Sequence, residues 1–210
     1  MARELIIFDM DGTLIYSSRL LANTINHVRA QLSLPPLPHD QIIGQVNNHQ
    51  INPAYYFYEV EHFEPIHEEW FSNYYTAHHS DELELYDGIY EILSWLRKRG
   101  TMIALATNAY RSSTLESLRH LKIEHFFDAI VCHDDVEKPK PAPDMLYALL
   151  NTLNVPQHNA LFIGDGPRDE EAAEAARIDY IMVDWGFTDH DNDKEVISSV
   201  QALKNALKDH

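Results

Sequence analysis

The sequence predicts an α/β protein built on a doubly wound parallel sheet, with an all-helical insert after the first strand. Three observations support this fold class. Short continuous apolar runs, which are typical of strands buried on both faces, recur along the chain. Stretches with helical spacing of apolar residues separate these runs, and an alternation of strands and helices favours a parallel sheet. Residues 17–83 lack the alternation.

The expected strands are the apolar runs at 5–8, 102–106, 129–132, 160–163 and 180–183. Each expected helix carries apolar residues at intervals of three and four positions. These stripes are Ile89, Ile92, Leu93 and Leu96, then Leu146, Leu149, Leu150 and Leu153, and finally Val196, Val200, Leu203 and Leu207. Gly100 is suited to end the helix before the second strand, because glycine adopts the left-handed C-cap conformation without strain.

Residues 17–83 form the expected insert, and residues 1–16 with 84–210 form the expected α/β domain. The insert contains a helical stripe of Leu21, Ile25, Val28 and Leu32. Three prolines predict a loop between helices at 34–39. The aromatic stretch at 55–75 is more typical of the core of a small helical bundle than of a substrate pocket, although a pocket or a dimer contact stays open.

The balance of charges excludes several classes of partner. Sixteen Lys and Arg against 33 Asp and Glu give a net charge of −17, which disfavours nucleic acid and anionic membrane. No apolar run reaches the roughly 18 residues of a membrane helix. The single cysteine, Cys132, excludes an internal disulfide framework and favours a reducing, cytoplasmic location. A bound phosphate would need its own local positive charge.

Four carboxylates follow expected strands. Asp9 and Asp11 come directly after the first strand, and Asp165 and Asp169 follow the strand at 160–163. Because ligands of open α/β sheets bind beyond the carboxyl ends of the strands, these carboxylates are expected to converge. An acidic turn or a capped helix would explain each pair taken alone. Their oxygens together make a hard-cation site, which suits Mg²⁺ better than zinc.

Two further groups of polar residues lie at the same edge. Thr107 and Asn108 follow the strand at 102–106, where either residue would also serve as an ordinary helix N-cap. The run at 138–144, Lys-Pro-Lys-Pro-Ala-Pro-Asp, is held extended by its prolines before a helix. A lysine in this run would supply the positive charge that the rest of the chain lacks, and both Lys138 and Lys140 begin a Lys-Pro-x-Pro segment.

Together the four motifs resemble those of the haloacid dehalogenase superfamily of phosphohydrolases. The resemblance covers residues 1–16 and about 84–190, which would form the Rossmann-like core of that superfamily. The insert matches its α-helical cap domain in position. The nearest resemblance is to phosphoglycolate-phosphatase-like members, whose cap follows the first motif.

The resemblance implies a role for each carboxylate. Asp9 would be the nucleophile that forms an aspartyl-phosphate, and Asp11 would protonate the leaving oxygen and later activate water. Mg²⁺ would be held by the Asp9 carboxylate, the Asp11 backbone carbonyl and Asp165. Asp169 would hydrogen-bond the metal-bound waters or the catalytic lysine. An acid at position 11 favours phosphate esters over haloacids, because only the ester needs its leaving group protonated.

The resemblance also implies how the phosphoryl group is held. Thr107 and Asn108 would bind it, with Thr107 counted among the catalytic residues, and a lysine would neutralise both the phosphoryl group and the nucleophile. In relatives this lysine lies at a fairly fixed distance before the turn that closes the next helix. That turn is expected near 154–155, which favours Lys140 over Lys138.

The segment 44–49 of the insert resembles the part of the cap that faces the site in relatives. Gln45 and Asn47 are therefore expected to bind substrate. The segment holds amides and an imidazole but no Arg or Lys, which favours a polar, uncharged leaving group such as a sugar or a small alcohol. Helix capping with side chains in solvent is an equally open interpretation.

The expected function is a Mg²⁺-dependent phosphatase that hydrolyses a small phosphorylated metabolite. A phosphomutase of the β-phosphoglucomutase type shares every core motif, and hydrolysis of pyrophosphate is a third alternative. A binding protein that has lost turnover is disfavoured, because none of the motif residues is missing: Asp9, Asp11, Lys140, Asp165 and Asp169. Either a monomer or a homodimer is compatible with the sequence.

Overall fold

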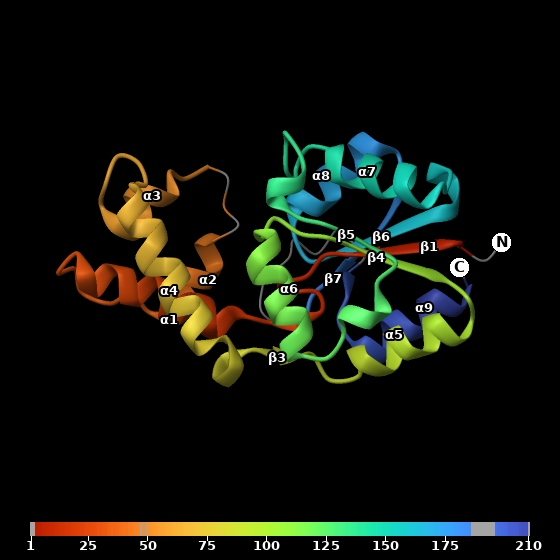
Figure 1. The fold of residues 1–210 in the computed structure, drawn as a ribbon, viewed down its shortest axis with the longest axis horizontal. Coiled ribbons are helices and arrows are strands. Elements are labelled where there is room, and N and C mark those ends of the chain that lie inside the picture. The colour runs from red at the N-terminus through yellow and green to blue at the C-terminus, as the bar shows by residue number, and fades with distance from the viewer. Residues whose placement is uncertain (1–2, 47, 49, 186–195, 210) are drawn as a thin grey trace. The chain divides into compact units, whose positions relative to one another are not determined.

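The computed structural model describes residues 3–46, 48, 50–185 and 196–209 (Figure 1). The chain divides into two compact units. One unit comprises residues 1–16 together with 84–210, and the other comprises residues 17–83. The insert thus separates residues 1–16 from the remainder of the first unit in the sequence.

Within the described residues, the first unit is built on a six-stranded sheet in the order β5-β4-β1-β6-β7-β8, in which all neighbours are parallel. The strands are β1 (Leu5–Phe8), β4 (Met102–Ala106), β5 (Ala129–Val131), β6 (Ala160–Gly164), β7 (Asp179–Val183) and β8 (Val196–Ile197). The expected α/β class with a parallel sheet is confirmed. Strand β1 lies between β4 and β6, with Leu5 opposite Met102 on one side and Ala160 on the other. The carboxyl ends of these three strands therefore lie side by side.

Helices cover both faces of this sheet, as Figure 1 shows, with α7 and α8 on one face and α5 and α9 on the other. Their bounds are α5 (Ile89–Lys98), α6 (Arg111–His120), α7 (Asp144–Leu153), α8 (Pro167–Ala176) and α9 (Val200–Asp209), with short 3₁₀ turns at Glu124–Phe126, His133–Asp135 and Gln157–Asn159. All four residues of β1 are buried. Leu5 and Ile7 join the core cluster on the α7 side with Leu146, Leu149 and Phe162. Burial on both faces explains why the strand is a continuous apolar run.

The structure corrects the last expected helix. Val196 lies in β8, where it pairs with Met182 of β7, and α9 begins only at Val200. Val196 lies four residues before Val200. This spacing is compatible with a helix that begins at Val196, and equally with a short strand that precedes the helix. Valine and isoleucine favour strands because their branched side chains suit a pleated sheet.

A two-stranded antiparallel ribbon joins the segments on either side of the insert. It consists of β2 (Ile15–Tyr16) and β3 (Glu84–Leu85), with Ile15 opposite Leu85. The sequence does not predict either strand, because two residues carry no periodicity. The ribbon fixes the end of the loop that follows β1.

The second unit consists of helices and loops in the part that the structure describes. The helices are α1 (Ser18–Gln31), α2 (His39–Val46), α3 (Pro53–Tyr58) and α4 (Pro65–Glu82). Its core contains Ile25, Val28, Ile42 and Phe57. The proline-rich loop ends where α2 begins, at His39. The aromatic stretch divides, since Phe57 and Tyr58 are buried whereas Tyr55 is 67% exposed.

None of the helices in the described ranges is long and apolar enough to cross a membrane.

Candidate active site

The loop that follows β1 carries the first two carboxylates. The backbone N–H of Asp9 donates to the carbonyl of Ile163 at 2.8 Å, which continues the ladder with β6 and fixes Asp9 at the carboxyl end of the sheet. The loop then closes on itself, because Leu14 and Ile15 both donate to the carbonyl of Met10, at 2.9 and 3.0 Å. Asp11 lies inside this turn and forms a bridge with Ile15.

Gly12 is required by this turn for two reasons. Its φ is +85°, in the left-handed region that side chains disfavour. A Cβ at this position would also overlap the carboxylate of Asp165. The glycine therefore allows the loop after β1 to approach the residue that follows β6.

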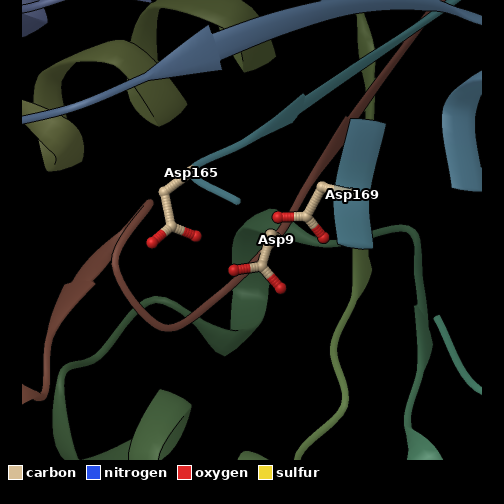
Figure 2. A group of neighbouring side chains, drawn as sticks. All are labelled: Asp9, Asp165 and Asp169. Carbon is tan, nitrogen blue, oxygen red and sulfur yellow. The ribbon is translucent and has the colours of Figure 1, made fainter. Parts of the chain in front are cut away.

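Three carboxylates gather at this edge of the sheet. Figure 2 shows Asp9, Asp165 and Asp169 turned toward one another, and one oxygen from each lies within 4.8 Å of the others. Asp9 follows β1, Asp165 follows β6, and Asp169 belongs to the first turn of α8. The pairing of β1 with β6 and the start of α8 directly after β6 explain why residues far apart in the sequence meet here.

Lys140 reaches the same group of carboxylates. Its Nζ donates to Oδ1 of Asp9 at 2.5 Å, to Oδ1 of Asp169 at 2.6 Å and to the carbonyl of Ala106 at 2.8 Å. Lys140 is only 4% exposed, whereas Lys138 lies on the surface. The geometry thus favours Lys140 over Lys138 as the lysine of the site.

The electrostatics of the site are dominated by burial. Burial raises the pKa of Asp9 to about 7, an effect that Lys140 opposes and Asp169 reinforces. Burial and the neighbouring Asp9 also raise the pKa of Asp165. For Lys140, burial alone would lower the pKa, but the charges of Asp169 and Asp9 outweigh it and raise the pKa above its ordinary value. The site therefore holds more negative charge than its lysine can balance.

This imbalance fits a divalent cation. Among the residues that the structure describes, three carboxylates contact or surround the one ammonium group of Lys140, which leaves an excess of two negative charges when all are ionised. Carboxylate oxygens are hard donors, of the kind that Mg²⁺ selects over softer ligands. The donor set and its charge thus suit a hard divalent cation.

Thr107 and Asn108 lie where the sequence predicts, directly after β4. Thr107 is buried, and its hydroxyl oxygen accepts a hydrogen bond from the N–H of Ala109 at 3.1 Å. The amide side chain of Asn108 forms two hydrogen bonds with the backbone of Lys140: it donates to the carbonyl at 2.8 Å and accepts from the N–H at 3.1 Å. The sequence does not predict this pairing, which ties the loop after β4 to the lysine.

The two residues expected to bind substrate from the insert are described in part. Gln45 lies in the last turn of α2, where its side-chain oxygen accepts a hydrogen bond from the amide of Asn48 at 2.8 Å. Asn47 lies outside the described residues.

Two aromatic residues that sequence reasoning missed contact the loop after β1. The indole N–H of Trp185 donates to the carbonyl of Thr13 at 3.1 Å. The backbone N–H of Tyr86 donates to the carbonyl of Leu14 at 3.2 Å. The sequence offers one sign that Trp185 lies near the site. This residue follows β7, at the same edge of the sheet as the carboxylates.

Comparison with known proteins agrees with this geometry. Residues 6–183 match the family model described as haloacid dehalogenase-like hydrolase. A phosphoglycolate phosphatase from Mesorhizobium japonicum is 30% identical over 197 residues, covering 90% of this chain and 86% of the relative. Pyrophosphatase PpaX from Halalkalibacterium halodurans is 25% identical over 186 residues, covering 89% and 86%.

A solved structure extends the agreement to the whole fold. The crystal structure of a candidate β-phosphoglucomutase from Thermotoga maritima superposes with a TM-score of 0.76 at 25% identity, covering 98% of this chain and 99% of that one. The family match spans most of the chain and both sides of the insert. The chain therefore belongs to the haloacid dehalogenase-like hydrolase family.

Proposed function

We propose that this enzyme is a phosphatase that hydrolyses a small phosphomonoester, with Asp9 as the nucleophile and Mg²⁺ as the cofactor. The observation that carries the proposal is the placement of Asp9. Its carboxylate stands at the carboxyl end of the central strand, 2.5 Å from the Nζ of Lys140 and beside two further carboxylates. A carboxylate that attacks a phosphate dianion needs such an arrangement, because the two anions repel each other.

Asp9, Asp165 and the backbone carbonyl of Asp11 would hold the cation, with Asp169 bonding its waters and Lys140. When bound, Mg²⁺ offsets the negative charge on the phosphoryl oxygens. Lys140 supplies a second, permanent positive charge at the nucleophile. Thr107 and Asn108, at the end of β4, bind the phosphoryl oxygens.

The reaction then proceeds in two half-reactions. In the first, an oxygen of Asp9 bonds to phosphorus while the bond from phosphorus to the alcohol oxygen breaks, and Asp11 gives its proton to that oxygen. In the second, a water oxygen bonds to the phosphorus of the aspartyl-phosphate while the bond from phosphorus to the Asp9 oxygen breaks, and Asp11 takes a proton from the water. Inorganic phosphate leaves, and Asp9 and Asp11 return to their starting states.

The relatives favour 2-phosphoglycolate as the first substrate to test. Several of the similar proteins are named phosphoglycolate phosphatase. Pyrophosphate is the second candidate because PpaX is among the relatives. Gln45 and Asn47 remain the proposed substrate contacts from the helical unit. A cytoplasmic location and a monomeric or homodimeric state also remain predictions from the sequence.

Release of phosphate from p-nitrophenyl phosphate tests the proposed chemistry. The native enzyme should turn over with Mg²⁺ and stop with EDTA, and Asp9→Asn should lose activity by at least about a thousandfold because it removes the nucleophile. Asp40→Asn, an exposed residue of α2, is the matched control and should retain native activity. Equal activity of Asp9→Asn and the native enzyme would contradict the proposal.

Product analysis separates the phosphatase from the mutase. With glucose 1-phosphate as substrate, a phosphatase yields inorganic phosphate, whereas a mutase returns the phosphoryl group to a sugar hydroxyl. Phosphorus NMR of the reaction mixture distinguishes the two products. A sugar phosphate with the phosphoryl group at a new position would favour the mutase.

A further inference from the structure

The loop that carries Asp11 is hydrogen-bonded by two residues that have no part in the proposed catalysis, Trp185 and Tyr86. Two residues beyond Asp11, the carbonyl of Thr13 accepts the indole N–H of Trp185 at 3.1 Å. Thr13 is completely buried, so the indole rather than solvent meets this carbonyl in the native protein. Trp185 follows β7, which is separated from β1 by β6, so the indole reaches across one strand to the loop.

The ring of Tyr86 packs against the indole and is itself packed against Tyr16. The ring of Tyr86 lies 5.7 Å from that of Trp185 and 5.8 Å from that of Tyr16, in tilted and edge-to-face contacts. The backbone N–H of Tyr86 also donates to the carbonyl of Leu14, one residue beyond Thr13. Consecutive carbonyls of the loop are thus held by Trp185 and Tyr86, whose rings pack against each other.

The phenol of Tyr86 adds no charge beside the carboxylates. Burial raises the pKa of the Tyr86 phenol, and the nearby charges of Asp165 and Asp11 raise it further, so the phenol stays neutral in the range where enzymes work. Tyr86 can therefore support the loop without adding a charge that would compete for the phosphoryl group.

We propose that Trp185 is a positioning residue for Asp11, and that its indole N–H holds the loop after β1 so that Asp11 can deliver its proton to the leaving oxygen. The inference rests on the proposed function, because it assigns Trp185 a part in the first half-reaction. Proton transfer depends on heavy-atom distances of hydrogen-bond length, so a small shift of the loop has a large effect. Trp185 itself does not touch the reacting atoms.

The test compares two substrates of similar size, p-nitrophenyl phosphate and benzyl phosphate. The nitrophenolate leaves readily without a proton, whereas the benzyl alkoxide needs one. The quantity to measure is kcat/KM, which reports the first half-reaction because loss of the alcohol makes that step irreversible. Trp185→Phe keeps an aromatic ring but removes the N–H. We expect it to lower kcat/KM by about 10- to 100-fold for benzyl phosphate and less than about threefold for p-nitrophenyl phosphate.

A double variant shows whether the effect passes through Asp11. Asp11→Asn should lower kcat/KM selectively for benzyl phosphate, by about 100-fold or more. Adding Trp185→Phe to Asp11→Asn should then cost nothing further on that substrate. Additive losses would overturn the inference, because Trp185 would then act independently of Asp11.

Trp95→Phe is the matched control. Trp95 belongs to α5 in the same unit, is half-buried like Trp185 and stacks on Arg99, away from the carboxylates. It should leave both substrates unchanged. Trp185 lines an open depression of about 500 Å³ with Tyr16 and Tyr86, so removal of the indole N–H leaves no sealed cavity and the variant should fold. Circular dichroism and the thermal midpoint of each variant check this point.

The remaining outcomes are decisive as well. Equal losses on both substrates in a folded Trp185→Phe protein would overturn the inference and leave Trp185 a purely structural role. A native enzyme that needs neither Mg²⁺ nor Asp9, or an Asp11→Asn variant with no selectivity between the leaving groups, would instead overturn the proposed function and this inference with it.

Discussion

At the scale of single residues, the ammonium group of Lys140 holds the site together. It binds Asp9 and Asp169 and is buried, so Lys140→Met would leave both carboxylates unpaired. Removal of one partner from such a group destabilises a protein by about 3–5 kcal/mol. We expect the free energy of unfolding, measured in urea at a pH above 7, to fall by about 3 kcal/mol. We also expect kcat to fall by about 10²- to 10³-fold.

Lys138→Met is the natural control for this experiment. Lys138 is exposed and two residues away in the same proline-rich run, so its removal should change the free energy of unfolding by less than about 0.5 kcal/mol. A larger loss of activity in Lys138→Met than in Lys140→Met would contradict the placement of the lysine.

The pKa of Asp9 makes a second prediction at this scale. In the metal-free protein its pKa is raised to about 7, so below that pH the carboxyl carries a proton that Mg²⁺ must displace. The pKa of Asp165, a second proposed ligand, is raised as well, so the apparent affinity for Mg²⁺ should fall by at least about tenfold for each pH unit below 7. Calorimetric titration with MgCl₂ at pH values on either side of 7 measures this dependence. An affinity that is constant across this range would contradict the prediction, and Asp9→Asn should show a weaker dependence because one of the two protons is gone.

The carboxylates and the lysine of the site could be predicted because each follows a buried strand or a proline-rich run, and the parallel sheet brings those ends together. The contacts of Asn108 and Trp185 could not. Both depend on which backbone group lies next to the side chain in space, and no spacing in the sequence encodes that. A neutral amide beside a lysine backbone and an indole beside a carbonyl leave no pattern of charge or periodicity.

At the scale of elements, α3 shows most clearly how the residue before a helix stabilises its start. Asn52 is its N-cap, and the side-chain oxygen accepts from the N–H groups of Ala54 and Tyr55 at 3.0 and 3.3 Å. The Asn52 amide also donates to the carbonyl of Glu61 at 3.0 Å. Asn52→Ala should therefore destabilise the helical unit by about 1 kcal/mol, as loss of a cap does elsewhere.

Chemical denaturation followed by circular dichroism measures this effect. Asn151→Ala, at an exposed position inside α7, is the control and should be neutral or slightly stabilising because alanine favours helix. Equal free energies of unfolding for the two variants would show that the Asn52 cap contributes nothing.

The strands of three or more residues could be predicted, whereas the two-residue strands could not. The runs that gave β1, β4 and β6 are buried on both faces and stand out as continuous apolar segments. The ribbon of β2 and β3, and the edge strand β8, are two residues each and only partly buried. Their pairing comes from the elements that flank them, which a local pattern does not contain.

At the scale of the whole molecule, the net charge of −17 predicts an unusual response to salt. Like charges repel in the folded state, and added salt screens that repulsion. The described surface ion pairs, such as Arg97–Asp128 and Arg119–Glu124, are weakened by salt but contribute only about 0–1 kcal/mol each. The thermal midpoint should therefore rise with KCl concentration, by a few degrees.

Differential scanning calorimetry in KCl at a fixed pH above neutrality checks this prediction. The same series near the isoelectric point, at about pH 5, is the control and should show a smaller rise. A midpoint that falls as KCl is added above neutrality would show that the ion pairs outweigh the general repulsion.

The position of β1 in the middle of the sheet has a consequence for synthesis on the ribosome. Leu5 pairs with Met102 and with Ala160, and both partners are synthesised long after it. While the helical unit emerges, the apolar segment Leu-Ile-Ile-Phe has no neighbouring strand to pair with, and unpaired apolar strands are prone to aggregate. A nascent chain of this protein is thus most vulnerable before Ala160 is made, and a holding chaperone would find its binding segment in β1.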